Sequence, residues 1–565
     1  MKNFILVTVW LLLFLACGDA QSPYSNKAAG LAPQYDLSIR LTPGAHRLEA
    51  TGTMRLPAVN FARDRLELSL SELMTDFRVE IIKPSMSAGV ARLTKRERPY
   101  SRPGWGTTTW TIQPPRPIPP TESVLLRFSY VGGGERTGFI FSLGSEVCFG
   151  AGIATAWYPE VEESQVESDG RLRGLRGRGN ISFSVPQGYV VHAQGARRST
   201  PEEMSQGKFR FEIRSPVFFS FAAGRYTVSQ TQETLPVALY LLRPRENADS
   251  YLSGSAKVLN ALSQEFGIYP HTEFAIVEVP TEQGERAGFA GASLDGFIIA
   301  NSDFLDKKFN TAYFGHEISH QWWGSLIRSK ALEGRWMLSE GMAQYGSLRA
   351  VEILEGAAAA ERYRRTGYPG YISDQNALGY FMLVANGTDH RLSDLPQEGD
   401  LSRVLSNSKG FIVWDMLSRA IGRGRFSRVL QSFIREHAYQ RVEWDEFLRK
   451  IENGAGRNLR WFNKQWFERT GAPDFQLTWR QEGRRVRGVI TQASPYYQTV
   501  LEIEAKDNQG RRLVRTIRIR GAQASFSFPI NFRAKSVVLD PHYLVLRWTP
   551  EYRAAARLSS RQVSQ

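Results

Sequence analysis

The sequence predicts a multidomain α+β protein in which two β-rich regions flank a mostly helical one. Residues 30–235 and 473–550 consist of short alternating or apolar runs separated by Gly and Pro turns, which is typical of antiparallel β-sandwiches. Residues 236–472 contain longer segments with helical periodicity. We expect a leader over 1–20 and a disordered tail over 551–565, and a chain of 565 residues suffices for three or four domains with ordinary cores.

The β-rich regions are recognised by the length and alternation of their apolar runs. In the N-terminal region, Tyr35–Leu41 and Ser123–Tyr130 have the pattern of strands. The C-terminal region repeats it at Val486–Ile490, Val500–Glu504 and Ser536–Pro541. Because neither region carries a helical stripe, both are predicted to form sheets packed face to face.

The helical region opens with Ala248–Phe266, whose apolar residues fall on one stripe. Phe274–Val279 follows as a predicted strand, and Ser347–Arg365 and Gly410–Gly422 are predicted helices. The run Thr470–Pro473 contains Gly and Pro, which break regular structure, so we place the end of the region there.

A helix is also predicted around His316-Glu317-Ile318-Ser319-His320, with Asn310 as its N-cap. Two histidines four apart on a helix lie on one face, so both rings can reach one ion. The intervening Glu317 can act as a general base in such a site. The chain has only 8 histidines, so this spacing is rare by chance, and two core histidines beside a surface glutamate remain the alternative.

A second helix is predicted over Arg335–Tyr345, and it carries Glu340. A carboxylate from this helix can complete a His₂Glu zinc site, in which one coordination position stays open for water. The sequence therefore predicts His316, His320 and Glu340 as the metal ligands.

The segments His316–Gly324 (HEISHQWWG) and Leu338–Tyr345 (LSEGMAQY) resemble the gluzincin zinc metallopeptidases of the membrane alanyl aminopeptidase and leukotriene-A4-hydrolase-like family. The resemblance implies a thermolysin-like, mostly helical catalytic domain, one Zn²⁺ per chain, and peptide or protein substrates. It implies that Glu340 is the third zinc ligand and that Glu317 is the general base for a zinc-activated water. One more residue than usual separates the second histidine from Glu340, and we expect it in the loop Arg328–Gly334.

Two positions depart from the family pattern. The family holds the free amino terminus of its substrate with a glutamate of an edge-strand motif, and Leu294 aligns with that glutamate. We expect either that this anchor is missing or that Asp295, Glu282 or Glu285 replaces it. If the anchor is missing, we expect a chain that is aminopeptidase-like in fold without being a strict aminopeptidase; if one of these residues replaces it, we expect an ordinary aminopeptidase.

The second departure concerns the tyrosine that, in the family, donates a hydrogen bond to the oxyanion of the tetrahedral intermediate. Asn407 aligns with it in the run Asn407–Phe411. An amide can also donate to an oxyanion, and losing one such donor typically lowers the rate by about 10²–10³. Two functions remain open: a zinc metallopeptidase, or a catalytically weak or inactive zinc-binding protein of the cell surface or periplasm.

The N-terminal residues predict export. Lys2 precedes the apolar run Phe4–Ala16, which is too short to span a bilayer and has the form of a secretory signal. Cleavage before Cys17 would give a lipid anchor at that residue, whereas cleavage before Gln21 would not. We expect a protein of the bacterial periplasm or cell envelope. No disulfide framework is expected, because Cys148 has no partner once Cys17 belongs to the leader.

The net charge of +15 raises the question of anionic partners. An arginine-rich, Gly-rich stretch contains Arg171, Arg173, Arg176 and Arg178, but it has no aromatic residues for stacking on bases. We expect a solvated hairpin loop and no nucleic acid, with contact to an anionic envelope surface as the alternative. The sequence does not predict an oligomeric state.

Overall fold

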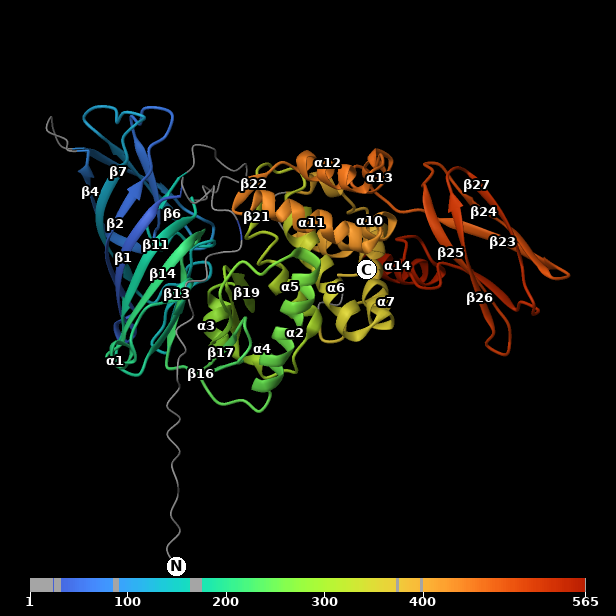
Figure 1. Cartoon of the computed structure of the whole chain (residues 1–565), viewed down its shortest axis with the longest axis horizontal. Coiled ribbons are helices and arrows are strands. Elements are labelled where there is room, and N and C mark those ends of the chain that lie inside the picture. Colours follow the sequence, from blue (N-terminus) through green and yellow to red (C-terminus); the bar gives the residue numbers. More distant parts are fainter. Residues whose placement is uncertain are drawn as a thin grey trace, which may run out of the picture.

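The computed structural model describes residues 24, 32–84, 91–162, 175–371, 375–396 and 400–563. They form a multidomain α+β protein, as predicted. An N-terminal β region, a central helical region and a C-terminal β region follow one another along an elongated molecule (Figure 1). The predicted leader with Cys17, as well as Arg171 and Arg173, lies outside the described residues.

The N-terminal region is built from several sheets. The largest has the strand order β13 (Ala196–Arg197), β14 (Lys208–Val217), β11 (Gly177–Ser184), β1 (Gln34–Thr42), β2 (Arg47–Leu56), β7 (Val124–Gly133), β4 (Met74–Lys83). The second has the order β10 (Glu160–Val161), β3 (Leu66–Ser71), β6 (Thr107–Gln113), β5 (Arg92–Arg98). The third has the order β12 (Val190–Ala193), β15 (Ser220–Gly224), β9 (Val147–Ala151), β8 (Phe141–Leu143). The short helix α1 (Pro201–Ser205) precedes β14.

Alternation sets which residues of these strands are buried. Along β1 every second residue is buried, and its apolar side chains join one core with those of β2, β7 and β11. The sheet is not purely antiparallel as predicted, because β1 pairs with β11 in parallel. Periodicity predicts the buried face of a strand but not the direction of its neighbour, which the tertiary fold decides.

The arginine-rich stretch is not a solvated hairpin loop where the structure describes it. Arg176 is buried, and its guanidinium forms an ion pair with Asp295 at 3.3 Å. Arg178 lies in β11, in register with Gln34 of β1.

The helical region contains a five-stranded mixed sheet that supports the site. Its strand order is β16 (Thr227–Gln230), β17 (Val237–Leu241), β18 (Phe274–Val279), β20 (Phe297–Asn301), β19 (Gly291–Leu294). Strands β17, β18 and β20 are parallel and fully buried, as their continuous apolar runs require. Strand β19 is antiparallel to β20 and forms the edge of the sheet, in agreement with the expected edge strand.

Helices cover this sheet and extend away from it. They are α2 (Ala248–Phe266), α3 (Thr281–Arg286), α4 (Ser302–Leu305), α5 (Thr311–Ser319), α6 (Met342–Glu355), α7 (Ala357–Thr366), α8 (Ala377–Ala385), α9 (Asp400–Leu405), α10 (Phe411–Ile421), α11 (Arg423–His437), α12 (Trp444–Ala455) and α13 (Arg460–Trp466). Two π-helical turns, η3 (Met337–Gly341) and η5 (Ser406–Gly410), precede α6 and α10, and β21 (Ile327–Ser329) pairs with β22 (Gln440–Val442). The single helix predicted over Ser347–Arg365 is instead α6 and α7, because Gly356 adopts a φ of 89° that ends the first helix.

The C-terminal region consists of two three-stranded sheets. One has the order β23 (Phe475–Glu482), β24 (Arg485–Gln492), β27 (Gln523–Pro529), and the other β26 (Arg512–Ile519), β25 (Thr499–Lys506), β28 (Ser536–Leu539). Their inward residues form a common core, among them Val486, Ile490, Leu501 and Ile503. Among the described residues, no helix has the length and apolarity needed to cross a membrane.

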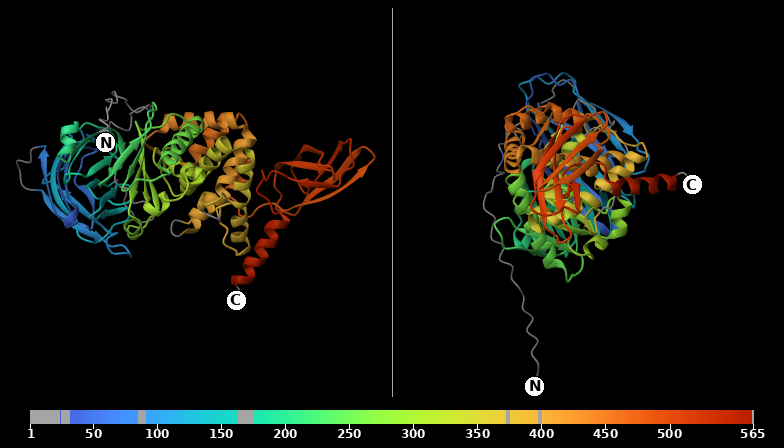
Figure 2. Two further views of the ribbon diagram at one scale, coloured as in Figure 1. Left: turned by 90° about the horizontal axis from the view of Figure 1, so that it is seen from below. Right: turned by 90° about the vertical axis from the view of Figure 1, so that its right-hand side faces the viewer.

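The tail expected to be disordered is instead helix α14, which runs over Pro550–Val563 and projects from the molecule (Figures 1 and 2). Its first turns pack on α8. Tyr552 is only 2% exposed, and its ring stacks on Phe381 with 5.0 Å between centroids. Glu551 forms an ion pair with Arg365 of α7 at 2.7 Å.

We predict that Tyr552→Ala releases α14 from the helical region. Truncating a buried aromatic side chain typically costs about 3 kcal/mol, which raises the open population of a locally unfolding segment about a hundredfold. Limited proteolysis followed by mass spectrometry should show much faster cleavage within 550–563. The control Leu558→Ala, at a side chain that is 64% exposed, should leave cleavage unchanged. Equal cleavage of both variants would mean that Tyr552 does not hold the helix.

Candidate metal centre and cleft

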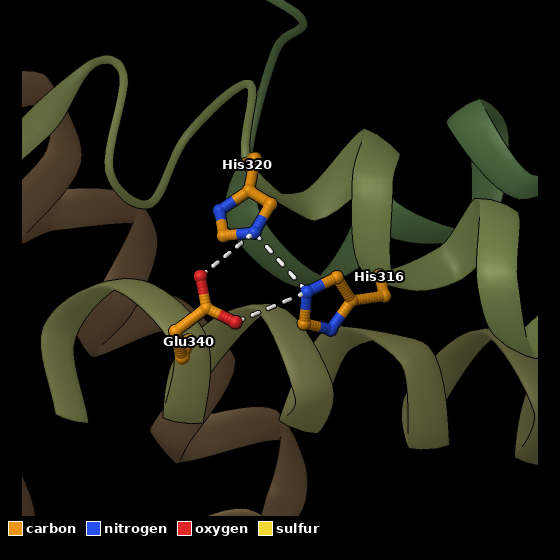
Figure 3. Close-up of side chains that lie close together, drawn as sticks. All are labelled: His316, His320 and Glu340. Carbon is orange, nitrogen blue, oxygen red and sulfur yellow. Dashed lines mark hydrogen bonds and ion pairs between the residues drawn. The ribbon is translucent and has the colours of Figure 1, made fainter. Parts of the chain in front are cut away.

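The motif helix α5 begins as predicted, with Asn310 as its N-cap. The Asn310 side-chain oxygen accepts a hydrogen bond from the backbone N–H of Tyr313 at 2.9 Å. Apolar residues of α5 such as Phe314 and Ile318 are buried in the core. The opposite face turns His316 and His320 toward Glu340, as Figure 3 shows.

Both imidazole rings are fixed by hydrogen bonds on the nitrogen that faces away from the centre. Nδ1 of His316 donates to Oε1 of Gln344 at 2.7 Å, and Nδ1 of His320 donates to the backbone carbonyl of Trp323 at 2.9 Å. With the Nδ1 protons committed in this way, both Nε2 atoms turn lone pairs into the same space, where they lie 3.1 Å apart.

Glu340 reaches this space from a π-helical turn. The predicted helix over Arg335–Tyr345 is in fact η3 followed by α6, and Glu340 lies in η3. Its Oε2 is 3.4 Å from Nε2 of His316, and its Oε1 is 3.5 Å from Nε2 of His320. Single π-turns within helices are frequent at functional sites, because the wider turn displaces a side chain from the ordinary helical face.

The three side chains fit a zinc ion. Zinc binds imidazole nitrogen at about 2.0–2.1 Å, which places tetrahedral ligand atoms about 3.3 Å from one another. The observed separations of 3.1, 3.4 and 3.5 Å bracket this value. Although burial raises the pKa of Glu340, its hydrogen bond to His316 and the charges of both histidines bring that pKa well below its usual range. The carboxylate is thus held in the ionised form that a metal requires.

Glu317 lies beside the three candidate ligands and lines the same cleft. Burial raises the pKa of its carboxyl to about 7; the neighbouring charge of His320 opposes this rise and that of Glu340 adds to it. A carboxyl with a pKa near neutrality can both accept and return a proton at physiological pH.

Sequence reasoning missed the network behind His316. Gln344 donates from Nε2 to the hydroxyl of Tyr363 at 2.9 Å, so its oxygen faces His316. The hydroxyl of Tyr371 also donates to that oxygen, at 3.2 Å, and Tyr371 lines the cleft. Gln344 follows Glu340 by one turn, a spacing that could have indicated it, whereas no spacing points to Tyr371.

Asn407 is placed differently from the expected oxyanion donor. It lies in η5, is 2% exposed, and donates from Nδ2 to Oε2 of Glu340 at 3.1 Å. The two π-turns pack closely, since a Cβ on Gly410 would lie 2.8 Å from Sδ of Met337. Asn407 therefore orients the candidate zinc ligand Glu340.

The position aligned with the family's amine anchor carries no charge toward the cleft. Leu294 is 2% exposed and packs in an apolar cluster with Phe297 and Ile299. Asp295 is engaged elsewhere: besides its ion pair with Arg176, it accepts a hydrogen bond from the backbone N–H of Phe218 at 3.1 Å.

The other two carboxylates considered as replacements lie on α3. The side chain of Glu282 is 84% exposed and lies 3.9 Å from Arg286. Neither Glu282 nor Glu285 lines the cleft, and nor does Asp295. The expectation that one of these three replaces the anchor is therefore not met in this structure. Among the described lining residues, the carboxylates are Glu317, Glu340 and Asp400.

The edge strand β19 is tied directly to the zinc helix. The hydroxyl of Ser293 donates to the backbone carbonyl of Glu317 at 2.8 Å. Gln321 donates from Nε2 to the carbonyl of Leu294 at 2.8 Å and accepts from the N–H of Gly296 at 2.8 Å. The strand and α5 therefore form one unit at the side of the cleft.

The cleft itself is a cavity of about 1090 Å³. Its lining includes Ala292 and Ser293 of β19, Arg328 of β21 and Arg441 of β22, together with the candidate ligands. This volume suits a ligand of several residues or a drug-sized molecule.

We predict that Asn407→Ala weakens zinc binding. Removing a hydrogen bond that orients a metal-ligating group typically lowers metal affinity about 10–100-fold. Competition with a calibrated zinc chelator measures the affinity, and circular dichroism checks that the variant is folded. Asn453→Ala, at an exposed position of α12, is the matched control and should bind zinc like the unaltered protein. Unchanged affinity in Asn407→Ala would show that Glu340 does not depend on this contact.

Comparison with known proteins finds similarity over the segment that contains this centre. Residues 294–466 match the family model described as the Peptidase family M1 domain. Aminopeptidase 2 of Candida albicans is 25% identical over 282 residues, which cover 46% of this chain and 29% of that protein. Aminopeptidase N of Streptomyces lividans is 22% identical over 314 residues, 53% of this chain and 36% of that protein. Endoplasmic reticulum aminopeptidase 2 of Homo sapiens is 22% identical over 236 residues, 40% of this chain and 24% of that protein.

The matches thus span between 24% and 36% of the length of these three relatives. The family segment runs from the end of β19 to the end of α13 and contains His316, His320 and Glu340. The segment that carries the candidate metal centre is thus similar to the Peptidase family M1 domain, as the two motif segments predicted.

Proposed function

We propose that this protein is a zinc-dependent metallopeptidase that hydrolyses peptide bonds, with one Zn²⁺ per chain held by His316, His320 and Glu340. The observation that carries the proposal is the convergence of both Nε2 atoms and the Glu340 carboxylate at the separations of a tetrahedral zinc site. The match to the M1 domain and the aminopeptidase names of the relatives support it.

The residues of the chain supply binding, orientation and proton transfer. A bound zinc ion would polarise the scissile carbonyl and make the attacking water more acidic. Glu317 takes the proton of that water and returns it to the leaving amine, a role for which a carboxyl with a pKa near 7 is suited. Strand β19 pairs with the extended substrate backbone as an added strand, since it lies at the edge of its sheet.

The proposed substrate mode follows from the missing carboxylate. A free ammonium entering where Leu294 stands would lose its hydration without gaining a partner. The enzyme is therefore proposed to accept peptides whose amino terminus is blocked or extended, so that it is not a strict aminopeptidase.

A second candidate function is a catalytically weak or inactive zinc-binding protein. It is favoured by Asn407, which lines the cleft but donates from its amide to Glu340. Digestion of a mixed peptide library by the zinc-loaded protein, read by mass spectrometry, separates the two functions, because only a peptidase produces new termini.

We predict that Glu317→Gln retains zinc but loses hydrolysis, by about 10²–10⁴-fold, because the amide cannot accept the proton of the attacking water. His316→Ala and His320→Ala should lose the metal itself. Zinc content is measured by elemental analysis and hydrolysis with a fluorogenic peptide. If Glu317→Gln were fully active, another group would have to be the base.

We also predict that blocking the substrate amine does not impair cleavage. A matched pair of fluorogenic peptides, one with a free and one with an acetylated amino terminus, should show similar kcat/KM values. A preference for the free amine of more than about tenfold, equivalent to roughly 1.4 kcal/mol, would contradict this expectation and point to an amine anchor after all.

We further propose export to the bacterial cell envelope, on the basis of the sequence from Lys2 to Ala16. If Cys17 is lipidated, the protein made in a bacterial host should partition into detergent, and Cys17→Ser should abolish this partitioning. A mature amino terminus at Gln21 in the native host would contradict the lipid anchor and leave export intact.

A further inference from the structure

One wall of the cleft is strongly cationic. The lining residues include five basic side chains, which come from β21, the segment after it, α9 and β22: Arg328, Lys330, Arg335, Arg403 and Arg441. Outside the metal ligands and Glu317, the only acidic lining residue that the structure describes is Asp400. Apart from the metal centre, the described charged residues that line the cleft are therefore mostly basic.

Two of these arginines are directly opposed across the β21–β22 pair. Arg328 and Arg441 are register partners in this parallel two-stranded sheet, and both line the cleft. Neighbouring strands lie about 4.8 Å apart, and like charges directly opposite one another destabilise a sheet. An anion in the cleft would reduce this repulsion.

Arg328 is also held in place. Its guanidinium lies over the ring of Phe218 with 5.1 Å to the centroid, and the buried Arg176 lies over that same ring at 5.2 Å. Phe218 is in turn fixed through its backbone N–H to Asp295. A pre-positioned guanidinium loses little freedom when it binds a carboxylate, which its planar fork of donors matches.

The basic side chains have partners within the chain, and this does not prevent them from binding a ligand. Lys330 pairs with Glu443 at 3.0 Å and Arg403 with Asp400 at 3.2 Å, and Arg328, Arg335 and Arg441 have further interactions of their own. Each guanidinium offers five N–H donors, so it can hold a substrate carboxylate beside an existing partner.

The charge of the candidate metal centre does not cancel the positive charge of these basic side chains. With Zn²⁺ bound, the ion and the carboxylates of Glu340 and Glu317 would sum to about zero, so the centre would add little net charge to that of the basic lining residues. The same wall repels an ammonium, in agreement with the absence of a carboxylate at Leu294. Both features favour negative over positive charge in the bound peptide.

We infer that the cleft selects peptides that carry a carboxylate close to the scissile bond, held by Arg328 and Arg441 on the β21–β22 wall. This inference rests on the proposed peptidase function and names its substrate class. The carboxylate can come from an Asp or Glu side chain or from the carboxyl terminus of a short peptide, since both present the same group to a guanidinium.

The test compares matched fluorogenic peptides that differ by one charge. One series moves a single Glu along an otherwise neutral, C-terminally amidated peptide. A second series has Gln at the same positions, and a third has Gln with a free carboxyl terminus. We expect at least one Glu peptide to be cleaved with a kcat/KM about tenfold or more above its Gln counterpart, the gain typical of one charge-assisted hydrogen bond. A comparable gain in the third series alone would identify the terminal carboxylate as the group that is bound.

Variants test whether Arg328 and Arg441 cause the preference for Glu over Gln peptides. Arg328→Gln and Arg441→Gln should each remove most of the difference in kcat/KM between Glu and Gln peptides. Arg428→Gln, an exposed position of α11 outside the cleft, removes the same net charge and should keep the difference. Loss of the preference in Arg428→Gln to the same extent would overturn the inference, because general charge rather than the wall would then be responsible.

Binding to the zinc-loaded Glu317→Gln protein, followed by fluorescence anisotropy of labelled peptides, separates this inference from the proposed function. If no peptide is hydrolysed by the unaltered protein, the proposed function fails, and tighter binding of Glu than of Gln peptides still supports the carboxylate-selective cleft. If peptides are hydrolysed but Glu and Gln series are bound and cleaved equally, the peptidase stands and the carboxylate preference is overturned.

Discussion

The structure depends on an electrostatic constraint at the candidate metal centre: two imidazole nitrogens and a carboxylate converge within 3.5 Å in a largely buried space. Such an arrangement is costly unless each group is held in a defined protonation state and a cation compensates it. The acceptors Gln344 and the Trp323 carbonyl commit the imidazole protons outward, and Asn407 holds the carboxylate. The helical region around the centre serves to fix these few contacts.

The absence of the family's amine anchor agrees with the basic side chains that line the cleft. Where the family places a carboxylate for a substrate amine, this chain has the buried Leu294, and the nearby Asp295 is used to fix Phe218 and Arg176. The residues that line the cleft include four arginines and a lysine instead. In the proposed function the cleft would therefore favour an anion over a cation, a difference that would change the class of substrate.

Much of the fold and the core of the site could be predicted from the sequence, because they depend on local periodicity. Helix α2 and strand β18 have the bounds that their apolar patterns indicated, and the spacing of His316 and His320 on α5 needs only 3.6 residues per turn. The N-cap at Asn310 follows from the preference of that residue type.

Other features of the fold and the site could not be predicted from local sequence patterns. The π-turns that carry Glu340 and Asn407 arise where two helices pack closely, and a sequence window does not contain both partners. The parallel pairing of β1 with β11 joins strands far apart in the chain. Helix α14 was missed because it has few large apolar residues, and because the burial of Tyr552 and Ala556 depends on the surface of the helical region.

The hydrogen bonds from Ser293 and Gln321 that join β19 to α5 affect how a bound peptide would be positioned. Because the strand that would pair with the peptide backbone and the helix that would hold the ion move as one body, the distance from a given backbone hydrogen bond to the reacting carbonyl is built into the protein. In the proposed peptidase, the register of the peptide on β19, in steps of one pleat, would determine which bond is presented for cleavage.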